Sequence, residues 1–202
     1  GRGPMGVAVA RDNGNPAGRA TAPGRAFGQV WAASALANLA DGIALAAAPL
    51  LAAALTRDPA LVSGLVVAQR LPWFLFSLIS GAMVDRLDRR RVLGWANLFR
   101  ALVLGLLGLA TLTGWASLPI LYGTFFLLGT AETFADNAAL ALLPAIVPRA
   151  GLERANGRLF ATNSAANEFV GPPLGGMLFA LLAALPILAN AAWYLLAGGL
   201  VL

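Results

Sequence analysis

Six charged side chains stand inside long apolar stretches of this sequence, where a charge is costly unless it faces a cavity or a partner. These residues are Asp41, Arg70, Arg100, Glu132, Asp136 and Glu168. Four acids against two arginines leave two carboxylates without a fixed cation. Such carboxylates avoid the cost of burial by taking up protons, which makes them candidate carriers of protons or binding groups for a cationic cargo. The alternative for each acid is a neutralised or hydrogen-bonded group that only packs helices together.

Counting about 1.5 Å per helical residue gives each of these charges a depth along its apolar stretch. Asp41 and Arg70 fall in the outer half and are candidates for an ion pair. Arg100, Asp136 and Glu168 fall in the inner half and form a second candidate cluster. Glu132 lies near mid-depth, one helical turn from Asp136. Three asparagines of the same stretches, Asn38, Asn163 and Asn167, add hydrogen-bonding groups that either bind a ligand or join helices.

The chain contains no cysteine and no histidine. It therefore cannot form a disulfide, a thiolate or imidazole metal site, a cysteine nucleophile or a Ser–His pair. We expect no enzyme activity, no metal and no cofactor.

The elements that must position these charges are apolar stretches of membrane-crossing length. The composition is 59% hydrophobic and 11% charged, too apolar for an ordinary soluble domain. Each stretch is near or above the roughly 20 residues that cross a bilayer as a helix. The sequence thus predicts an all-α polytopic membrane bundle of six helices over residues 27–202, cut short at the end of the sixth helix, after a disordered tail at residues 1–26. The predicted spans are Phe27–Leu55, Leu61–Val84, Val92–Thr113, Leu118–Val147, Leu159–Leu185 and Pro186–Leu202.

The placement of the arginines predicts how the bundle is oriented. All 14 basic residues are arginine, and eleven of them lie in the tail or in the breaks after the second and fourth spans. The opposite breaks hold only Arg57, which Asp58 balances. Because arginine-rich short loops stay in the cytoplasm, the N-terminus is expected inside and the protein in the cell (inner) membrane. Arginines sorted in this way report topology, so the bilayer is the expected partner and nucleic acid is not.

An internal repeat relates the first and fourth spans. Residues 40–49 and 135–144 match at six of ten positions with an offset of 95, and the matches include Asp41 with Asp136 and Pro49 with Pro144. The two spans run in opposite directions, so the pattern predicts a three-plus-three inverted repeat, as in many secondary transporters. Chance similarity between two alanine-rich helices is the alternative.

The loop between the second and third spans, Gly81 to Arg91, resembles the signature loop of the major facilitator superfamily, G-x-x-x-D-R-x-G-R-R. A glycine lets helices approach closely, and arginine forks bind carboxylates and helix C-termini. The resemblance implies that this loop latches the inner gate during alternating access; a merely topogenic basic loop is the alternative. The candidate latch residues are Gly81, Asp85, Arg86, Asp88, Arg89 and Arg90, of which Asp88 stands where the family usually has glycine.

The fifth span contains Gly171-Pro172-Pro173-Leu174-Gly175-Gly176 and resembles the fifth-helix motif of antiporters in that superfamily, G-P-x-x-G-G. Proline kinks a helix and glycine permits close, sliding packing, which favours a hinge at Gly171, Pro172, Gly175 and Gly176. An ordinary proline kink is the alternative. Further similarity to the transmembrane secretion effector branch, which includes the enterobactin exporter, lies in Phe134 to Ala138, Leu143 to Arg149, Leu152 to Asn156 and Asn167 to Gly176.

The resemblance implies the first six-helix half of a twelve-helix secondary transporter whose C-terminal half is missing from this sequence. The implied activity is proton-coupled efflux of a small amphipathic molecule, such as a drug or siderophore, with Asp41, Glu132 and Glu168 handling protons or cationic cargo. Two alternatives remain open: a membrane scaffold that transports nothing, and a half-transporter that pairs with a partner or with itself.

Overall fold

The computed structural model describes residues 24–202, and every regular element among them is helical. Most of the predicted tail lies outside the described residues. Arg25 and Ala26, which we assigned to the tail, already belong to the first helix. The helices are α1 (Arg25–Leu55), α2 (Pro59–Val84), α3 (Arg89–Leu112), α4 (Leu118–Ile146), α5 (Leu152–Ser164), α6 (Gly171–Leu181) and α7 (Leu185–Val201).

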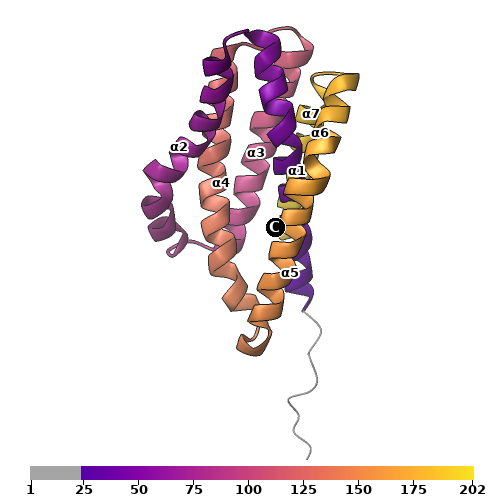
Figure 1. Ribbon diagram of the computed structural model, residues 1–202. Coiled ribbons are helices and arrows are strands. Elements are labelled where there is room, and N and C mark those ends of the chain that lie inside the picture. Colours follow the sequence, from indigo (N-terminus) through magenta and orange to yellow (C-terminus); the bar gives the residue numbers. More distant parts are fainter. Residues whose placement is uncertain (1–23) are drawn as a thin grey trace, which may run out of the picture.

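Four of the described helices, α1 to α4, are long and apolar enough to cross a membrane, and α7 is a shorter apolar helix of 17 residues. Between α5 and α6 the chain continues as the π-helical segment Ala165–Val170, whose ends keep helical backbone angles. These three pieces form one rod, drawn in orange in Figure 1. The predicted all-α membrane bundle is therefore confirmed.

The boundaries of the fifth span are wrong by several residues. We began this span at Leu159, whereas α5 begins at Leu152, so Arg154 and Arg158 lie on the helix and not in a break. The extra turns are polar, and Glu153 in the first turn stabilises the helix N-terminus. An interpretation based on apolar length misses a helical end of this kind.

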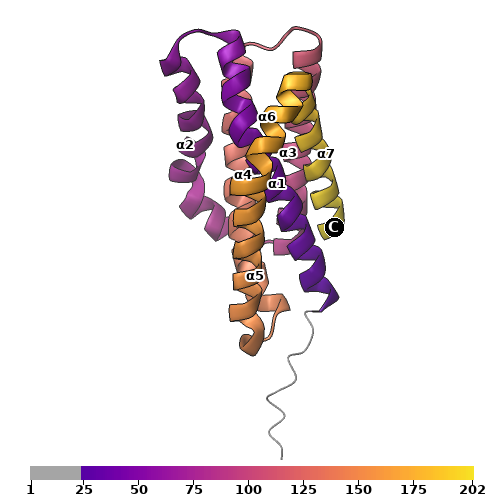
Figure 2. The same cartoon turned by 45° about the vertical axis from the view of Figure 1, so that its right-hand side comes forward.

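Helix packing follows the predicted internal repeat. α3 packs against α7 and α4, α1 packs against α7 and α6, and α2 packs against α4. An inverted repeat makes α1 equivalent to α4, α2 equivalent to the α5–α6 rod, and α3 equivalent to α7. Under this equivalence each helix pair corresponds to a pair of the same set; the contact between α2 and α4, for example, corresponds to the contact between the rod and α1. In Figures 1 and 2, α1 rises from the lower end of the bundle and α4 descends toward that end, so the exchanged helices are antiparallel. The arrangement is the one that an inverted repeat of three helices requires.

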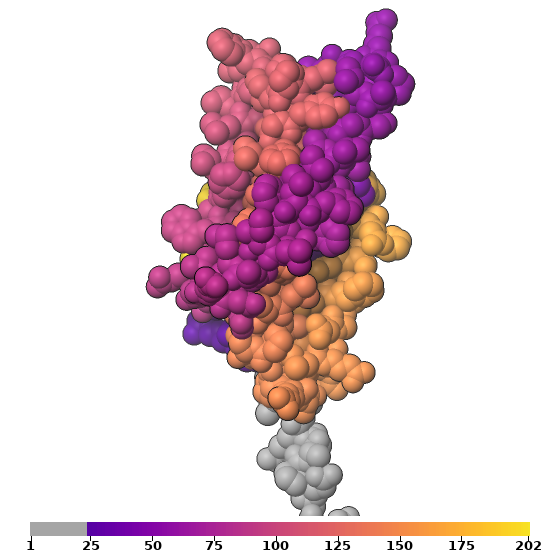
Figure 3. Space-filling model, turned by 90° about the vertical axis from the view of Figure 1, so that its left-hand side faces the viewer, coloured from indigo at the N-terminus to yellow at the C-terminus, as the bar shows by residue number. Residues whose placement is uncertain are grey.

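The surface of the bundle is apolar over wide areas, while its interior is built from small and medium side chains. Leu78 is 88% exposed, Leu181 77% and Leu140 72%. Figure 3 shows α2, in purple, lying across the face formed by α3 and α4. Apolar side chains exposed on this scale would be unfavourable in water and are expected where lipid covers the protein.

Candidate transport site

Arg100 of α3 is the centre of the buried polar cluster. Its side chain is 4% exposed, and its Nη2 lies 2.7 Å from Oδ1 of Asp41 on α1. Tyr194 of α7 donates its hydroxyl to the same carboxylate oxygen. The Tyr194 ring also stacks on the guanidinium, whose Cζ lies 4.1 Å from the ring centroid. One arginine and one aspartate thereby join α1, α3 and α7 in the interior.

The expected ion pair between Asp41 and Arg70 is wrong, because Asp41 pairs with Arg100. Depth along a helix does not define the direction in which a side chain points. In addition, α3 begins at Arg89, three residues before the predicted start, which moves Arg100 about 4.5 Å deeper than we counted. Arg70 lies on α2, which packs mainly against α4.

Glu132 of α4 shares Arg100 with Asp41, but at a longer distance. Its Oε2 lies 3.9 Å from Nη2 of Arg100 and accepts a hydrogen bond of 3.5 Å from Gln69 of α2. Asp41 receives two short donations, whereas Glu132 receives only these two long contacts. The Glu132 side chain is 25% exposed. Of the two carboxylates beside Arg100, Glu132 therefore has the longer and weaker polar contacts.

A cavity of about 380 Å³ opens between α2 and α4 next to Glu132. Gly129 brings the two helices together there, since a β-carbon on it would lie 1.9 Å from the carbonyl oxygen of Gln69. The lining residues are Gln69, Arg70, Trp73 and Phe74 of α2 and Gly129, Glu132, Thr133 and Asp136 of α4.

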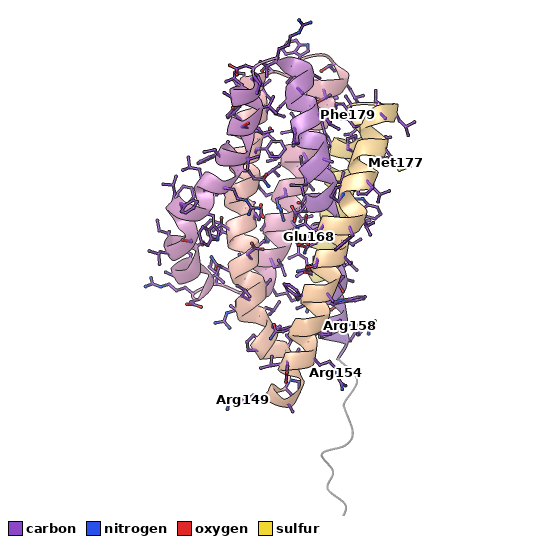
Figure 4. All side chains as sticks on the ribbon, viewed as in Figure 1. Arg149, Arg154, Arg158, Glu168, Met177 and Phe179 are labelled. Carbon is purple, nitrogen blue, oxygen red and sulfur yellow. The ribbon has the colours of Figure 1, made fainter. Side chains whose placement is uncertain are left out.

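The expected cluster of Arg100, Asp136 and Glu168 is also wrong. Within the described residues, the acids within 4 Å of Arg100 are Asp41 and Glu132. Asp136 lines the cavity with Arg70, while Glu168 is an exposed side chain on the π-helical segment. Figure 4 shows Glu168 at about mid-height of the α5–α6 rod.

The asparagines behave mainly as structural groups. Asn38 donates to the carbonyl oxygen of Ser34 on its own helix, at 2.9 Å. Ser34 in turn donates to Asn163 at 3.3 Å and so joins α1 to α5. The carbonyl of Asn167 lies 2.6 Å from the position of a β-carbon on Gly42, so its backbone packs against α1.

Residues 88–90, at the start of α3, join the lower end of this helix to α1, α4 and α7. Asp88 caps α3 by accepting from the amides of Arg90 and Arg91 at 3.0 and 3.2 Å. Arg89 donates to the carbonyl of Ala141 on α4 at 3.1 Å. Arg90 donates to the carbonyl of Val201 on α7 and, at 3.2 Å, to Gln29 on α1. The aspartate that replaces the usual glycine thus acts as a helix cap.

The remaining latch residues make fewer contacts within the described chain. Asp85 lies 3.5 Å from Arg89, and its side chain is 70% exposed. Arg86 is exposed as well. A β-carbon on Gly81 would meet nothing within 4 Å, so the close approach that we predicted at this glycine is not made by the described helices.

The predicted hinge in the fifth span divides into two kinds of glycine. A β-carbon on Gly171 would lie 2.5 Å from Gly42 on α1, and one on Gly175 would lie 2.4 Å from the carbonyl oxygen of Ile43. Figure 2 shows α6 crossing α1 at this contact. A β-carbon on Gly176 would meet nothing within 4 Å. Gly171 and Gly175 therefore bring two backbones together, and Gly176 does not.

The irregular backbone lies just before these glycines. Pro172 and Pro173 have no amide hydrogen to donate to the preceding turn, which contains the π-helical segment Ala165–Val170. A π-helical turn inside a longer helix often accompanies a functional site.

Sequence reasoning missed Tyr194, Gln69, Trp73 and Phe74. Tyr194 is one of only two tyrosines in the chain and stands in an otherwise apolar span, which was a usable signal. Gln69 is next to Arg70 in the sequence. Nothing in the sequence distinguishes Trp73 and Phe74 from aromatic residues that face lipid.

Comparison with known proteins gives consistent matches. The profile of a family described as "Transmembrane secretion effector" matches residues 20–198. Uncharacterized MFS-type transporters of Mycobacterium bovis and Mycobacterium tuberculosis are each 32% identical to the chain over 114 residues. These residues are 56% of this chain but only 25% of each relative's length. No solved structure matches the chain.

Proposed function

Because the chain belongs to the transmembrane secretion effector family of the major facilitator superfamily, we propose that it is the N-terminal six-helix half of a transporter that exports a small amphipathic molecule in exchange for protons. The remaining half would come from the part of the protein that this sequence does not include, since the match covers a quarter of each relative. In this proposal the protein is multi-pass in the inner membrane with its N-terminus in the cytoplasm.

The observation that carries the proposal is the sharing of Arg100 between Asp41 and Glu132. Arg100 is buried and lies 2.7 Å from Asp41 but 3.9 Å from Glu132. The single positive charge of the guanidinium cannot neutralise two carboxylates. If Glu132 is protonated, Arg100 pairs with Asp41 alone. Uptake or release of a proton at Glu132 would then change how strongly α4 is attracted to α3.

Two further features support alternating access as the mechanism. Arg89 and Arg90 in the first turn of α3 bind helix carbonyls and an amide side chain, and such contacts break and form at little net cost near water. The α5–α6 rod is anchored to α1 through Gly171 and Gly175, while α5 contacts α1 through side chains such as Ser34 and Asn163. The rod would bend at the π-helical segment between them.

The test is proton-driven export by the full-length protein in proteoliposomes. We expect the substitution Glu132→Gln to abolish export that depends on an imposed pH gradient, because a glutamine cannot exchange a proton. Export is followed with a fluorescent amphipathic probe such as ethidium, and proton movement with a pH-sensitive dye.

The matched control is Glu153→Gln, which removes an exposed acid from the first turn of α5 and should leave export unchanged. Unaltered coupling in Glu132→Gln would refute the assignment of Glu132. A wild-type protein that moves neither probe nor protons would instead favour a scaffold.

A further inference from the structure

We propose that the cavity between α2 and α4 binds an organic cation with an aromatic or aliphatic body, and that this is the cargo class of the transporter. The inference rests on the proposed function and specifies the chemical class of its cargo. It depends on three properties of the cavity walls: their size, their charge and their aromatic surface.

The volume suits a small molecule. Pockets that bind small ligands usually enclose about 300 to 1,000 Å³, and this cavity encloses about 380 Å³. Four residues of α2 form one wall and four of α4 form the other. The two helices are in close backbone contact at Gly129, where the cavity begins.

The charge of the walls favours a cation. Glu132 and Asp136 lie one helical turn apart on α4, and Arg70 on α2 is the basic residue of the lining. Arg100 is shared between Asp41 at 2.7 Å and Glu132 at 3.9 Å, so the three acids Asp41, Glu132 and Asp136 stand against two arginines. The cavity thus carries one unmatched negative charge when its acids are ionised. An anionic siderophore would face two carboxylates, whereas a singly charged amine or quaternary ammonium would balance the walls.

The aromatic wall favours a cation with a substantial apolar body. The rings of Trp73 and Phe74 are perpendicular, with centroids 5.3 Å apart. Both residues line the cavity, and they are 55% and 74% exposed. Aromatic faces attract organic cations through their quadrupole and also bury apolar surface. A carboxylate wall opposite an aromatic wall therefore matches both parts of such a molecule.

Glu132 lies in this cavity and also beside Arg100. The charged groups that surround it are Asp41 of α1, Arg70 of α2, Arg100 of α3 and Asp136 of its own helix, with the Tyr194 hydroxyl of α7 on Asp41. A cation that binds next to Glu132 stabilises its ionised form and so competes with the proton. This competition would couple the cargo to proton movement within one site.

The experiment measures binding, separately from transport, in the full-length protein in nanodiscs. The probe is tetraphenylphosphonium, a permanent cation that has no proton to lose, and binding is measured by equilibrium dialysis. Asp136→Asn and Trp73→Leu should each weaken binding about tenfold, the loss expected for about 1.4 kcal/mol. Arg70→Gln should strengthen binding severalfold, because it removes a repelling charge, and misfolding cannot imitate a gain.

Two control variants remove one acid and one tryptophan from exposed positions away from the cavity. Glu153→Gln and Trp115→Leu should bind the probe as the wild type does. The neutral analogue triphenylphosphine oxide should compete poorly. The inference is overturned if neither tetraphenylphosphonium, ethidium nor benzalkonium binds, if the neutral analogue competes equally, or if Asp136→Asn and Trp73→Leu bind as the wild type does.

Failure of this inference can be told apart from failure of the proposed function. If the Asp136, Trp73 and Arg70 variants change cation binding as expected but the protein shows no gradient-driven flux, export is refuted and the binding site is supported. Proton-driven export of ethidium with cation binding insensitive to the cavity variants would refute the site and leave export intact.

Discussion

Arg100 shows how one buried cation can determine the roles of several acids. It holds Asp41 at 2.7 Å and Glu132 at 3.9 Å, and its Nε has no hydrogen-bond partner within the described residues. An arginine in this position is expensive to bury and is retained only if its partners compensate the cost. The cluster is therefore sensitive to the loss of any one member.

The first prediction at this scale concerns the Arg100–Asp41 pair. Arg100→Met should destabilise the bundle by about 3 to 5 kcal/mol, because Asp41 is left buried without its cation. Arg100→Met combined with Asp41→Asn should recover much of this loss. Thermal unfolding in detergent, arranged as a double-mutant cycle, measures both effects. Additive losses in the double variant would show that the pair contributes no coupling.

The second prediction concerns the cap of α3. Asp88→Ala should cost about 1 kcal/mol, the usual cost of removing an N-cap side chain. Asp88→Asn should cost little, because asparagine accepts the same amide hydrogens. Both are read from the unfolding temperature, and equal temperatures for the alanine and asparagine variants would contradict the capping role.

At the scale of elements, α5 and α6 contact α1 in different ways. Side-chain hydrogen bonds join α5 to α1, including one of 3.0 Å from Trp31 to Thr162. Backbone contacts at Gly171 and Gly175 join α6 to α1. The first kind of contact tolerates movement, whereas the second tolerates no added atom.

The prediction for this element compares glycines within one motif. Gly175→Ala places a methyl group 2.4 Å from the carbonyl oxygen of Ile43, so we expect reduced yield of monodisperse protein and a lower unfolding temperature. Gly176→Ala, whose methyl group meets nothing within 4 Å, is the control and should behave like the wild type. Equal sensitivity of both positions to alanine would show that the motif acts through chain flexibility and not through this contact.

At the scale of the whole molecule, the sequence was sufficient to predict the elements but not which side chains meet. Apolar length predicted the all-α membrane bundle, because a helix satisfies its own backbone hydrogen bonds wherever lipid surrounds it. It did not predict the start of α5 at Leu152, because that turn is polar. The partners of Asp41 depend on the rotation of each helix about its axis, which depth along the helix does not fix. A repeat offset of 95 residues, in contrast, was enough to predict which helices pack alike.

The same repeat has a consequence for how the two halves of the bundle have diverged. Asp41 and Asp136 occupy equivalent positions, but the equivalent of Arg100 in the second repeat is Leu195. If the repeats descend from one duplicated ancestor, the difference between Arg100 and Leu195 gave two originally identical acids different surroundings. Asp41 is held by Arg100 within the helix bundle, whereas Asp136 lines the cavity, where we propose that a ligand binds.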